Sequence, residues 1–349
     1  MFAYSQGAWA HDLMIATYIL FGAVSLLLCL WARPIGRRLG LLDMPDGRRK
    51  THARPTPLVG GIAVMAPVGA MCVVLAVTTT LAPLYATLGA TAGAFLLVGL
   101  IDDRGQIRPL YRLLLSTILF LGAVLAVPAL SVDFLLFSFY PHLIAPGAWL
   151  MLGFSLLCLV GVQNATNMAD GKDGLAIGLS LLWTSLLFAN APDHLRPLLI
   201  VLAVGLAVAL IFNLSGHLFL GDSGSYSVSA FVGFVTIYCY GIGFPVLRAD
   251  AVAVWFLIPV VDCLRLMAVR LARGHSPFSS DQNHLHHILA RWMPWRWGLP
   301  LYLSLVGVPS LLAHWLPSLT LAWALAALLT YGVLLGRAGQ SLGQRAPST

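Results

Sequence analysis

Long apolar runs recur along almost the whole sequence and constrain its fold more than any other feature. Each is close to the length of about 17–25 residues that an α-helix needs to cross a bilayer. Eleven such runs occupy residues 12–32, 58–80, 84–101, 110–128, 147–162, 174–190, 196–214, 225–243, 250–268, 298–316 and 318–336. Backbone polar groups in lipid must be satisfied within their own segment, so helices are expected. The sequence therefore predicts an all-α, polytopic membrane helix bundle of about 11 transmembrane helices, forming a single domain over residues 1–349.

The composition excludes the main classes of soluble protein. Hydrophobic residues make up 59% of the chain and charged residues only 9%, whereas about 25% of a soluble domain is charged. This excludes a soluble globular domain, a disordered chain and a nucleic-acid-binding module, despite the formal net charge of +7. The first apolar run follows Asp12 rather than a basic segment, so we interpret it as a retained membrane helix and not as a signal peptide.

The positive charges indicate the orientation in the membrane. With eleven spans, one face of the membrane receives residues 33–57, 102–109, 163–173, 215–224, 269–297 and 337–349. Counted with the helix ends at Arg112 and Arg265, that face carries 18 of the 20 Lys and Arg residues. The positive-inside rule makes it cytoplasmic. We therefore expect the N-terminus outside, the C-terminus in the cytoplasm and the chain in a plasma membrane.

Carboxylates cluster on the same predicted face, and all 13 acidic residues are Asp. Ionisable groups close to hydrocarbon are costly and often mark a functional site. Asp102 and Asp103 end the third span, where two adjacent carboxylates need a shared proton or a cation. The alternative is a hydrated helix end whose acids pair with Arg104 and Arg108.

Two further clusters combine Asp with amides, glycines and serines. In the first, Asn164, Asn167 and Asp170 recur every three residues, so they share one helix face, and Asp173 follows. In the second, Asp222 lies between glycines, which suits a ligand of a hard cation such as Mg²⁺. Ser223 or Ser225 is expected to cap the following helix. The alternatives are a polar C-cap with a turn, and a plain N-cap turn.

The fourth cluster contains three histidines, His284, His286 and His287. If residues 281–292 form a helix, His284, His287 and Arg291 share one face of a short amphipathic helix on the membrane surface. A phosphate clamp or an acid–base role fits these imidazoles better than zinc, because no Cys or additional carboxylate is adjacent.

Basic residues before the second span complete the set. Lys50 and His52 could bind a nucleotide sugar or a lipid phosphate, or could serve only topology and anionic lipid heads. All the polar clusters lie at helix ends on one face, and no loop is long enough for a soluble catalytic domain. Such a site suits a reaction that joins a soluble anion to a lipid. Asp residues with Mg²⁺, basic residues and histidines favour phosphoryl transfer.

These motifs resemble those of the polyprenyl-phosphate N-acetylhexosamine-1-phosphate transferases. They run in the family's order over residues 50–290: Pro57-Leu58-Val59-Gly60-Gly61, Asp102-Asp103, Asn164 to Gly174, Phe219 to Ser225, Pro259-x-x-Asp262 and His284-x-His286-His287. The last motif is similar to that of the undecaprenyl-phosphate N-acetylglucosaminyl-1-phosphate transferase branch. Gln106 and Lys172 depart from residues that are common in the family at those positions.

The resemblance implies a substrate pair, a cofactor and residue roles. UDP-N-acetylhexosamine would donate the sugar phosphate to undecaprenyl phosphate and release UMP, with Mg²⁺, or Mn²⁺ in its place, held by Asp222. The catalytic set would be Asp102, Asp103, His284, His286 and His287. The substrate-binding set would be Lys50, His52, Asn164, Asn167, Asp170, Asp173, Asn213 and Phe219. Membrane lipids are expected partners, nucleic acid is not, and a homodimer is implied by the resemblance alone.

Two other functions stay open at this stage. The first is the related transfer of phospho-MurNAc-pentapeptide in peptidoglycan synthesis, whose enzymes usually carry three consecutive histidines. The second is an ion-coupled transporter with a proton path of Asp and His, although such a path should cross the membrane midplane. A measurement of which UDP-sugar, if any, releases UMP separates both of them from the first function.

Overall fold

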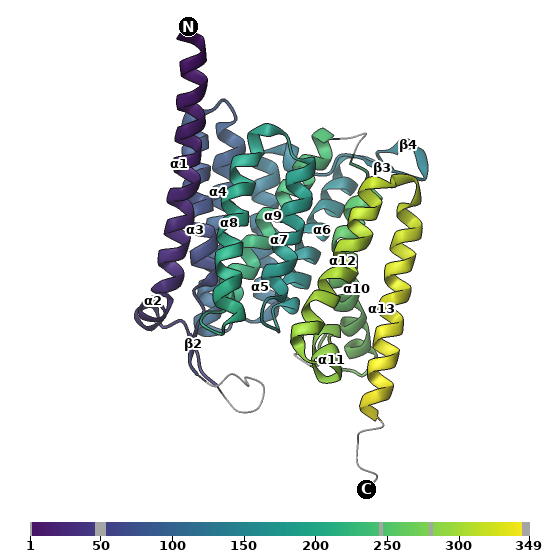
Figure 1. Ribbon diagram of the computed structural model, residues 1–349. Coiled ribbons are helices and arrows are strands. Elements are labelled where there is room, and N and C mark those ends of the chain that lie inside the picture. The colour runs from purple at the N-terminus through teal and green to yellow at the C-terminus, as the bar shows by residue number, and fades with distance from the viewer. Residues whose placement is uncertain (1, 46–53, 244–246, 279–281, 344–349) are drawn as a thin grey trace. The chain divides into compact units, whose positions relative to one another are not determined.

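The computed structural model describes residues 2–45, 54–243, 247–278 and 282–343 (Figure 1). The helices in these ranges are α1 (Phe2–Leu30), α2 (Ala32–Leu39), α3 (Gly60–Thr78), α4 (Ala82–Gly105), α5 (Pro109–Ala126), α6 (Ala148–Ala169), α7 (Leu175–Asn190), α8 (Arg196–Leu214), α9 (Gly221–Gly243), α10 (Ala249–Ala272), α11 (Leu285–Trp292), α12 (Trp295–Trp315) and α13 (Thr320–Gly343). Short 3₁₀ turns cover Pro128–Leu130, Asp193–Leu195 and Pro317–Leu319. The strands are β1 (Leu42–Asp43), β2 (Thr56–Pro57), β3 (Leu135–Phe137) and β4 (Tyr140–Ile144).

The predicted membrane bundle is confirmed. All eleven apolar runs lie in helices, and within the described ranges ten of these are long and apolar enough to cross a membrane. The eleventh, α7, is apolar but has 16 residues. Among the runs that continue as helix beyond their predicted ends are α4, as far as Gly105, and α6, as far as Ala169. These extensions carry Asp102, Asp103, Asn164 and Asn167, so the polar motifs are part of the helices.

The chain divides into two compact units, each built from two separate stretches. Unit 1 comprises Met1–Gln106 and Pro192–Val228, and unit 2 comprises Ile107–Ala191 and Ser229–Thr349. Helix α9 begins in unit 1 and continues in unit 2.

Unit 1 packs α1, α3, α4 and α8 against one another. Tyr85 of α4 is buried, and its hydroxyl donates a hydrogen bond to the carbonyl of His194 at 2.7 Å, which joins α4 to the turn before α8. The antiparallel pair of β1 and β2 brings the chain to the start of α3. The core is therefore assembled from helices far apart in sequence.

Unit 2 is organised around α10, which contacts α6, α12 and α13. The short helix α11 packs against α12 and α13 at the end where α10 finishes (Figure 1). Trp183 of α7 is buried, and its indole N–H donates to the carbonyl of Trp255 in α10 at 2.8 Å. This packing brings the C-terminal helices next to the histidine motif.

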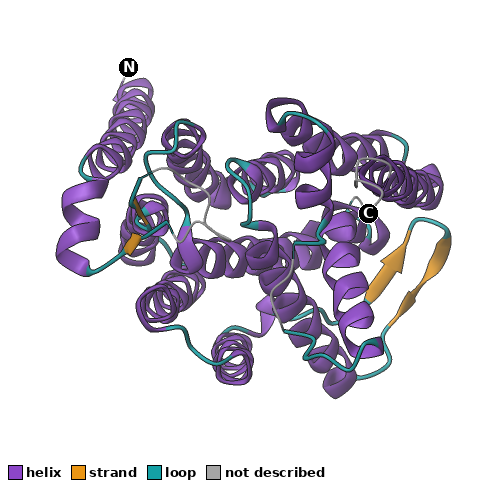
Figure 2. Cartoon of the chain, turned by 90° about the horizontal axis from the view of Figure 1, so that it is seen from below, coloured by secondary structure: helices purple, strands orange, loops and turns teal. Residues whose placement is uncertain are grey.

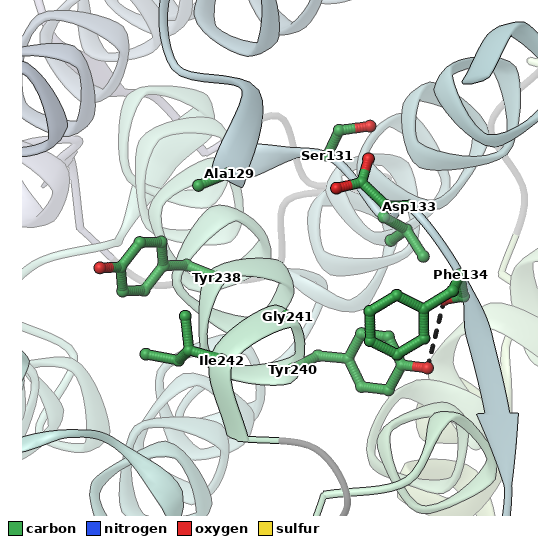
Figure 3. Close-up of a pocket in the computed structure, with 9 residues that line it drawn as sticks. Ala129, Ser131, Asp133, Phe134, Tyr238, Tyr240, Gly241 and Ile242 are labelled. Atoms are coloured by element: carbon green, nitrogen blue, oxygen red, sulfur yellow. Dashed lines mark hydrogen bonds between the residues drawn. The ribbon is translucent and has the colours of Figure 1, made fainter. Parts of the chain in front are cut away.

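The hairpin of β3 and β4 projects from unit 2 as two antiparallel strands (Figure 2). The Tyr240 hydroxyl donates a hydrogen bond to the carbonyl of Phe134 (Figure 3). It also accepts one from the backbone N–H of Leu136. The backbone N–H of Ser138 donates to the Asp250 carboxylate. A recess of about 130 Å³ beside Tyr240 contains none of the predicted site residues.

Candidate functional site

Three polar motifs meet in unit 1 with their backbones in direct contact. A Cβ atom added at Gly61 of α3 would lie 2.3 Å from the backbone nitrogen of Gly224 in α9. One added at Gly99 of α4 would lie 2.3 Å from Cα of Ser223. Both separations are far below van der Waals contact, so a residue with a side chain would force the helices apart. The glycines therefore allow α3 and α4 to lie against the first turn of α9.

Backbone hydrogen bonds fix the segment that leads into α9. The N–H groups of Gly60 and Gly61 donate to the carbonyls of Phe219 and Leu220, each at 3.0 Å, and the N–H of Phe219 donates to the carbonyl of Pro57 at 2.9 Å. The Gly60-Gly61 pair thus has a structural role in placing the Asp222 segment. The Phe219 side chain is half-buried, and its role in substrate binding stays a prediction.

Asp103 caps helix α9 from a different helix. Its Oδ1 accepts a hydrogen bond from the backbone N–H of Asp222 at 2.8 Å, and its Oδ2 accepts one from that of Ser223 at 3.1 Å. Gly221 has φ +75°, which lets the chain turn directly into the helix. The prediction that Ser223 or Ser225 caps this helix is wrong, because both lie inside it and Asp103 binds its terminal N–H groups.

Asp102 faces the same helix one turn further on. It is 4% exposed, and its Oδ2 accepts a hydrogen bond from the Tyr226 hydroxyl at 2.7 Å. Because Tyr226 follows Asp222 by four residues, both project from one face of α9, and Asp102 lies against that face. The sequence suggests Arg104 as a partner of these acids. Its side chain is instead fixed by a hydrogen bond from its Nε to the carbonyl of Leu39, at 2.7 Å.

The donor set of this cluster fits a hard divalent cation. Mg²⁺ is commonly held by one or two carboxylates, with phosphate oxygens and water completing its shell. Asp222 and Asp102 supply such a pair, and Asp222 retains exposed surface. The part of the chain that the structure describes contains no group of three or more His, Cys or Asp side chains arranged to hold a metal.

The remaining unit 1 predictions have different outcomes. Asn213 is buried, and its amide donates to the carbonyl of Leu218 at 3.0 Å, so it stabilises the turn before the Asp222 segment. Its role in substrate binding stays a prediction. Lys50 and His52 lie outside the described residues.

Asp262 of α10 is the centre of the polar cluster in unit 2. It is 2% exposed and accepts hydrogen bonds from four different groups. Oδ1 accepts from the Arg265 guanidinium at 2.9 Å and from the Tyr331 hydroxyl at 2.7 Å. Oδ2 accepts from Nδ1 of His284 at 2.8 Å and from the backbone N–H of Leu285 at 3.2 Å. A carboxylate surrounded by donors is stabilised in its ionised form.

The three histidines form a stack that packs on the loop after α6. The rings of His284 and His286 are nearly parallel, with centroids 5.4 Å apart, and those of His286 and His287 lie 4.2 Å apart. A Cβ atom added at Gly171 would lie 2.6 Å from Nε2 of His286 and 3.2 Å from Nε2 of His287. Two motifs that are 115 residues apart in sequence are therefore in contact, and a glycine at position 171 makes this possible.

His286 is the most deeply buried member of the stack. It is 1% exposed, and its Nε2 has no hydrogen-bond partner among the described residues. Burial, with the neighbouring imidazoles of His287 and His284, holds the pKa of His286 well below its usual value of 6.5. This side chain is therefore neutral at physiological pH. Its uncompensated ring nitrogen faces the Gly171 loop.

The motif of two amides and one acid at the end of α6 lies partly in the helix and partly at the residue that ends it. Asn164 donates to the carbonyl of Val160 in its own helix at 2.8 Å. Asn167 lies in the last turn, and Asp170 is the residue that ends the helix. The predicted helix face is thus present for Asn164 and Asn167, whereas Asp170 follows the helix with ψ 48°. The binding roles of all three stay predictions.

The loop after α6 is held by α12. The indole N–H of Trp295 donates to the carbonyl of Asp173 at 2.8 Å. Asp173 itself is exposed, whereas Lys172 is half-buried. The loop therefore presents carboxylates at its surface while its backbone is fixed. The role of Asp173 in substrate binding is not tested by this placement.

The predicted helix over residues 281–292 is too long at its start. Helix α11 begins at Leu285, and His284 precedes it in extended conformation with φ −62° and ψ 149°. His284 therefore does not share a helix face with His287 and Arg291. The reason is that Asp262 accepts hydrogen bonds from both the His284 ring and the Leu285 backbone, which fixes the chain at this point.

Sequence reasoning missed three residues of these clusters and undervalued a fourth. These are Tyr226, Arg265, Tyr331 and Asp262. Tyr226 could have been found from its position four residues after Asp222. Asp262 belongs to the Pro259-x-x-Asp262 motif but received no role, and Tyr331 is an isolated tyrosine in an apolar run. The prediction that the clusters of both units share one pocket stays a prediction.

Comparisons with known proteins place the sequence among membrane transferases. The profile described as glycosyl transferase family 4 matches residues 84–240. A Yersinia pestis protein named undecaprenyl-phosphate alpha-N-acetylglucosaminyl 1-phosphate transferase is 31% identical, over 74% of this chain and 72% of its own. A protein of the same name from Escherichia coli O157:H7 is 28% identical, over 88% and 87%. A Bacillus subtilis protein named probable undecaprenyl-phosphate N-acetylglucosaminyl 1-phosphate transferase is 28% identical, over 76% and 75%.

Proposed function

Because the chain belongs to glycosyl transferase family 4, we propose that it transfers N-acetylglucosamine-1-phosphate from UDP-N-acetylglucosamine to undecaprenyl phosphate. The reaction would release UMP and form the first lipid-linked intermediate of a cell-envelope polysaccharide. The observation that best supports this is the carboxylate cluster of unit 1. There, Asp102 lies against the face of α9 that carries Asp222, at the ends of helices long enough to span a membrane.

We assign the roles in unit 1 from the surroundings of each carboxylate. Asp222 would hold Mg²⁺, which neutralises diphosphate charge when bound. Asp102 would accept the proton of the lipid phosphate. An oxygen of that phosphate attacks the sugar-bearing β-phosphorus, a new P–O bond forms, and the bond to the α-phosphate oxygen breaks. UMP leaves with the electron pair of that bond.

In unit 2, the histidine stack and the loop after α6 supply the other groups. His284 and His287 would contact the diphosphate, and His286, neutral and buried, would offer a hydrogen bond rather than a charge. Asn167, Asp170 and Asp173 would hold the nucleotide and the sugar. Positioning and neutralisation of charge do most of the work in phosphoryl transfer, and these residue types suit both tasks.

The orientation proposed from the basic residues places this chemistry on the cytoplasmic face of the bacterial plasma membrane. UDP-sugars are soluble anions, so carboxylates at the cytoplasmic end of α4 would meet them from the cytosol. A single cysteine introduced at exposed Asp173 should react with a membrane-impermeant maleimide only in inside-out vesicles. Reaction in right-side-out cells would contradict the orientation.

The test of the function is UMP release by the purified full-length protein. We expect release with UDP-N-acetylglucosamine and undecaprenyl phosphate, dependent on Mg²⁺ and lost in Asp222→Asn. Asp193→Asn is a matched control, because that side chain is 90% exposed and pairs with Arg196. Release with UDP-MurNAc-pentapeptide instead would assign the chain to peptidoglycan synthesis. No UMP release with any UDP-sugar, together with uptake of solute into liposomes, would favour a transporter.

A further inference from the structure

Asp262 joins three elements of unit 2 that are distant in sequence. It lies on α10, receives hydrogen bonds from Tyr331 of α13, and holds both the ring of His284 and the backbone of Leu285. Arg265 reinforces the same group, since it donates to Asp262, to the Tyr331 hydroxyl at 2.8 Å and to the carbonyl of Asn283. The first residue of the histidine motif is therefore fixed from the side of α10 and α13.

The chemistry of this group defines the state of the His284 ring. Guanidinium, phenol and backbone N–H are all donors towards Asp262, so the carboxylate has no proton to offer. Nδ1 of His284 must therefore carry the hydrogen in the 2.8 Å contact. Nε2 is then left to accept a hydrogen bond, or to donate one when the ring is protonated. Partners of this kind commonly set the tautomer and orientation of a functional histidine.

We propose that Asp262 is a positioning residue that sets the tautomer and direction of His284, and that Tyr331 completes its hydrogen-bond shell. The last helix of the chain, α13, thereby contributes to the site through Asp262. This inference rests on the proposed function, in which His284 contacts the diphosphate. A purely architectural role, in which Asp262 only secures the start of α11, makes a different prediction for the ring of His284.

The variant Asp262→Asn separates the two roles. Asn is of similar size and its oxygen can still accept from Arg265 or Tyr331, but its amide N–H₂ would face Nδ1 of His284. That ring nitrogen must then accept, and its hydrogen moves to Nε2. The orientation of the imidazole is kept while its tautomer is reversed. Nε2, which accepts a hydrogen bond in the neutral wild-type ring, would then donate one to the substrate.

Ring-¹⁵N spectra of histidine-labelled, full-length protein in detergent measure the tautomer without substrate. His284→Ala identifies the signals of His284. We expect hydrogen on Nδ1 in wild type and in Tyr331→Phe, and on Nε2 in Asp262→Asn. An unchanged tautomer in Asp262→Asn would overturn the proposal. Because this measurement needs no turnover, it stays informative if the protein releases no UMP and the proposed function fails.

Kinetics give the second readout. Loss of a partner of this kind typically costs about 10- to 100-fold in activity. We expect a loss in this range in kcat for Asp262→Asn, with KM for the UDP-sugar changed less than about threefold. Wild-type kcat in a folded Asp262→Asn protein would contradict the inference.

A double-mutant cycle protects the test against misfolding of Asp262→Asn. Tyr331→Phe removes one donor from Asp262 and should lower kcat by a few-fold in wild type but not in His284→Ala, because its effect passes through His284. An equal loss in both backgrounds would overturn the proposal. Tyr240→Phe is the matched control: this buried hydroxyl also makes two hydrogen bonds, but to the β3 segment. It should leave kcat unchanged.

Discussion

The adjacent acids Asp102 and Asp103 have different hydrogen-bond partners, which predicts different roles, and replacing each with Asn tests this prediction. Asp103 uses its two oxygens to cap α9, whereas Asp102 lies on the face of α9 that carries Asp222. We expect Asp103→Asn to remain active and Asp102→Asn to be nearly inactive. If both acids instead contacted the ion or the substrate, the two variants would be affected alike.

The expected magnitudes follow from the hydrogen bonds. Asn has one oxygen, so Asp103→Asn keeps the 2.8 Å bond to Asp222 and loses the 3.1 Å bond to Ser223. A hydrogen bond to a charged acceptor contributes about 1.5–3 kcal/mol, but Asn is nearly as good a helix cap as Asp. Carried in full into the transition state, a net cost of about 1–1.5 kcal/mol lowers kcat/KM by about five- to twelvefold. Loss of the proton acceptor in Asp102→Asn should cost about 10²–10⁴-fold.

The assay is UMP release with saturating lipid phosphate, accompanied by Mn²⁺ affinity from electron paramagnetic resonance. Asp103→Asn should bind Mn²⁺ within about threefold of wild type, since a cap does not touch the ion. Asp222→Asn should lose this binding and serves as the positive control. A loss in Asp103→Asn as large as in Asp102→Asn, or a loss of Mn²⁺ binding, would show that Asp103 is a ligand and refute its role as a cap.

Three further outcomes are expected. Gly99→Ala should lower the melting temperature by at least about 5 °C, because its Cβ would meet the backbone of α9, whereas Gly93→Ala on the same helix faces open space and should not. Gly171→Ala should lower kcat by about tenfold or more by displacing His286, whereas Gly161→Ala should be neutral in a matched assay. The depressed pKa of His286 means that, below pH 6.5, the unfolded state takes up a proton before the folded state does. The melting temperature should therefore decrease as the pH is lowered from about 7 to about 5. An equally steep decrease in the variant His286→Gln would contradict this.

The helices could be predicted from the sequence because the membrane leaves few alternatives. Runs of about 20 apolar residues satisfy their backbone groups as helices, and all eleven appear as such. The helix ends were less predictable. Helix α6 continues from residue 162 to Ala169 through polar residues, since the loop beyond it packs on the histidine stack. Hydropathy records only the apolar part of such a helix.

The composition of each cluster could be predicted, but the partners of its members could not. Asp102 and Asp103 are indistinguishable in sequence, and their division into two roles depends on how α4 meets α9. Tyr331 lies 69 residues from Asp262, in an apolar run that carries no motif. A local pattern gives the residue types that gather at a helix end. Long-range packing decides which oxygen meets which donor.

The donors bound to Asp262 and Asp103 distinguish these two supporting carboxylates from Asp222 and Asp173, which a ligand can reach. A charge inside an apolar bundle is tolerated when donors surround it, and such a group has little capacity left for a ligand. Asp262, with four donors at 2% exposure, and Asp103, bound to the end of α9, are of this kind. Asp222 and Asp173 retain exposed surface, so a ligand can reach them. Substitution by Asn should therefore affect stability or histidine geometry at the first two positions, and ligand affinity at the last two.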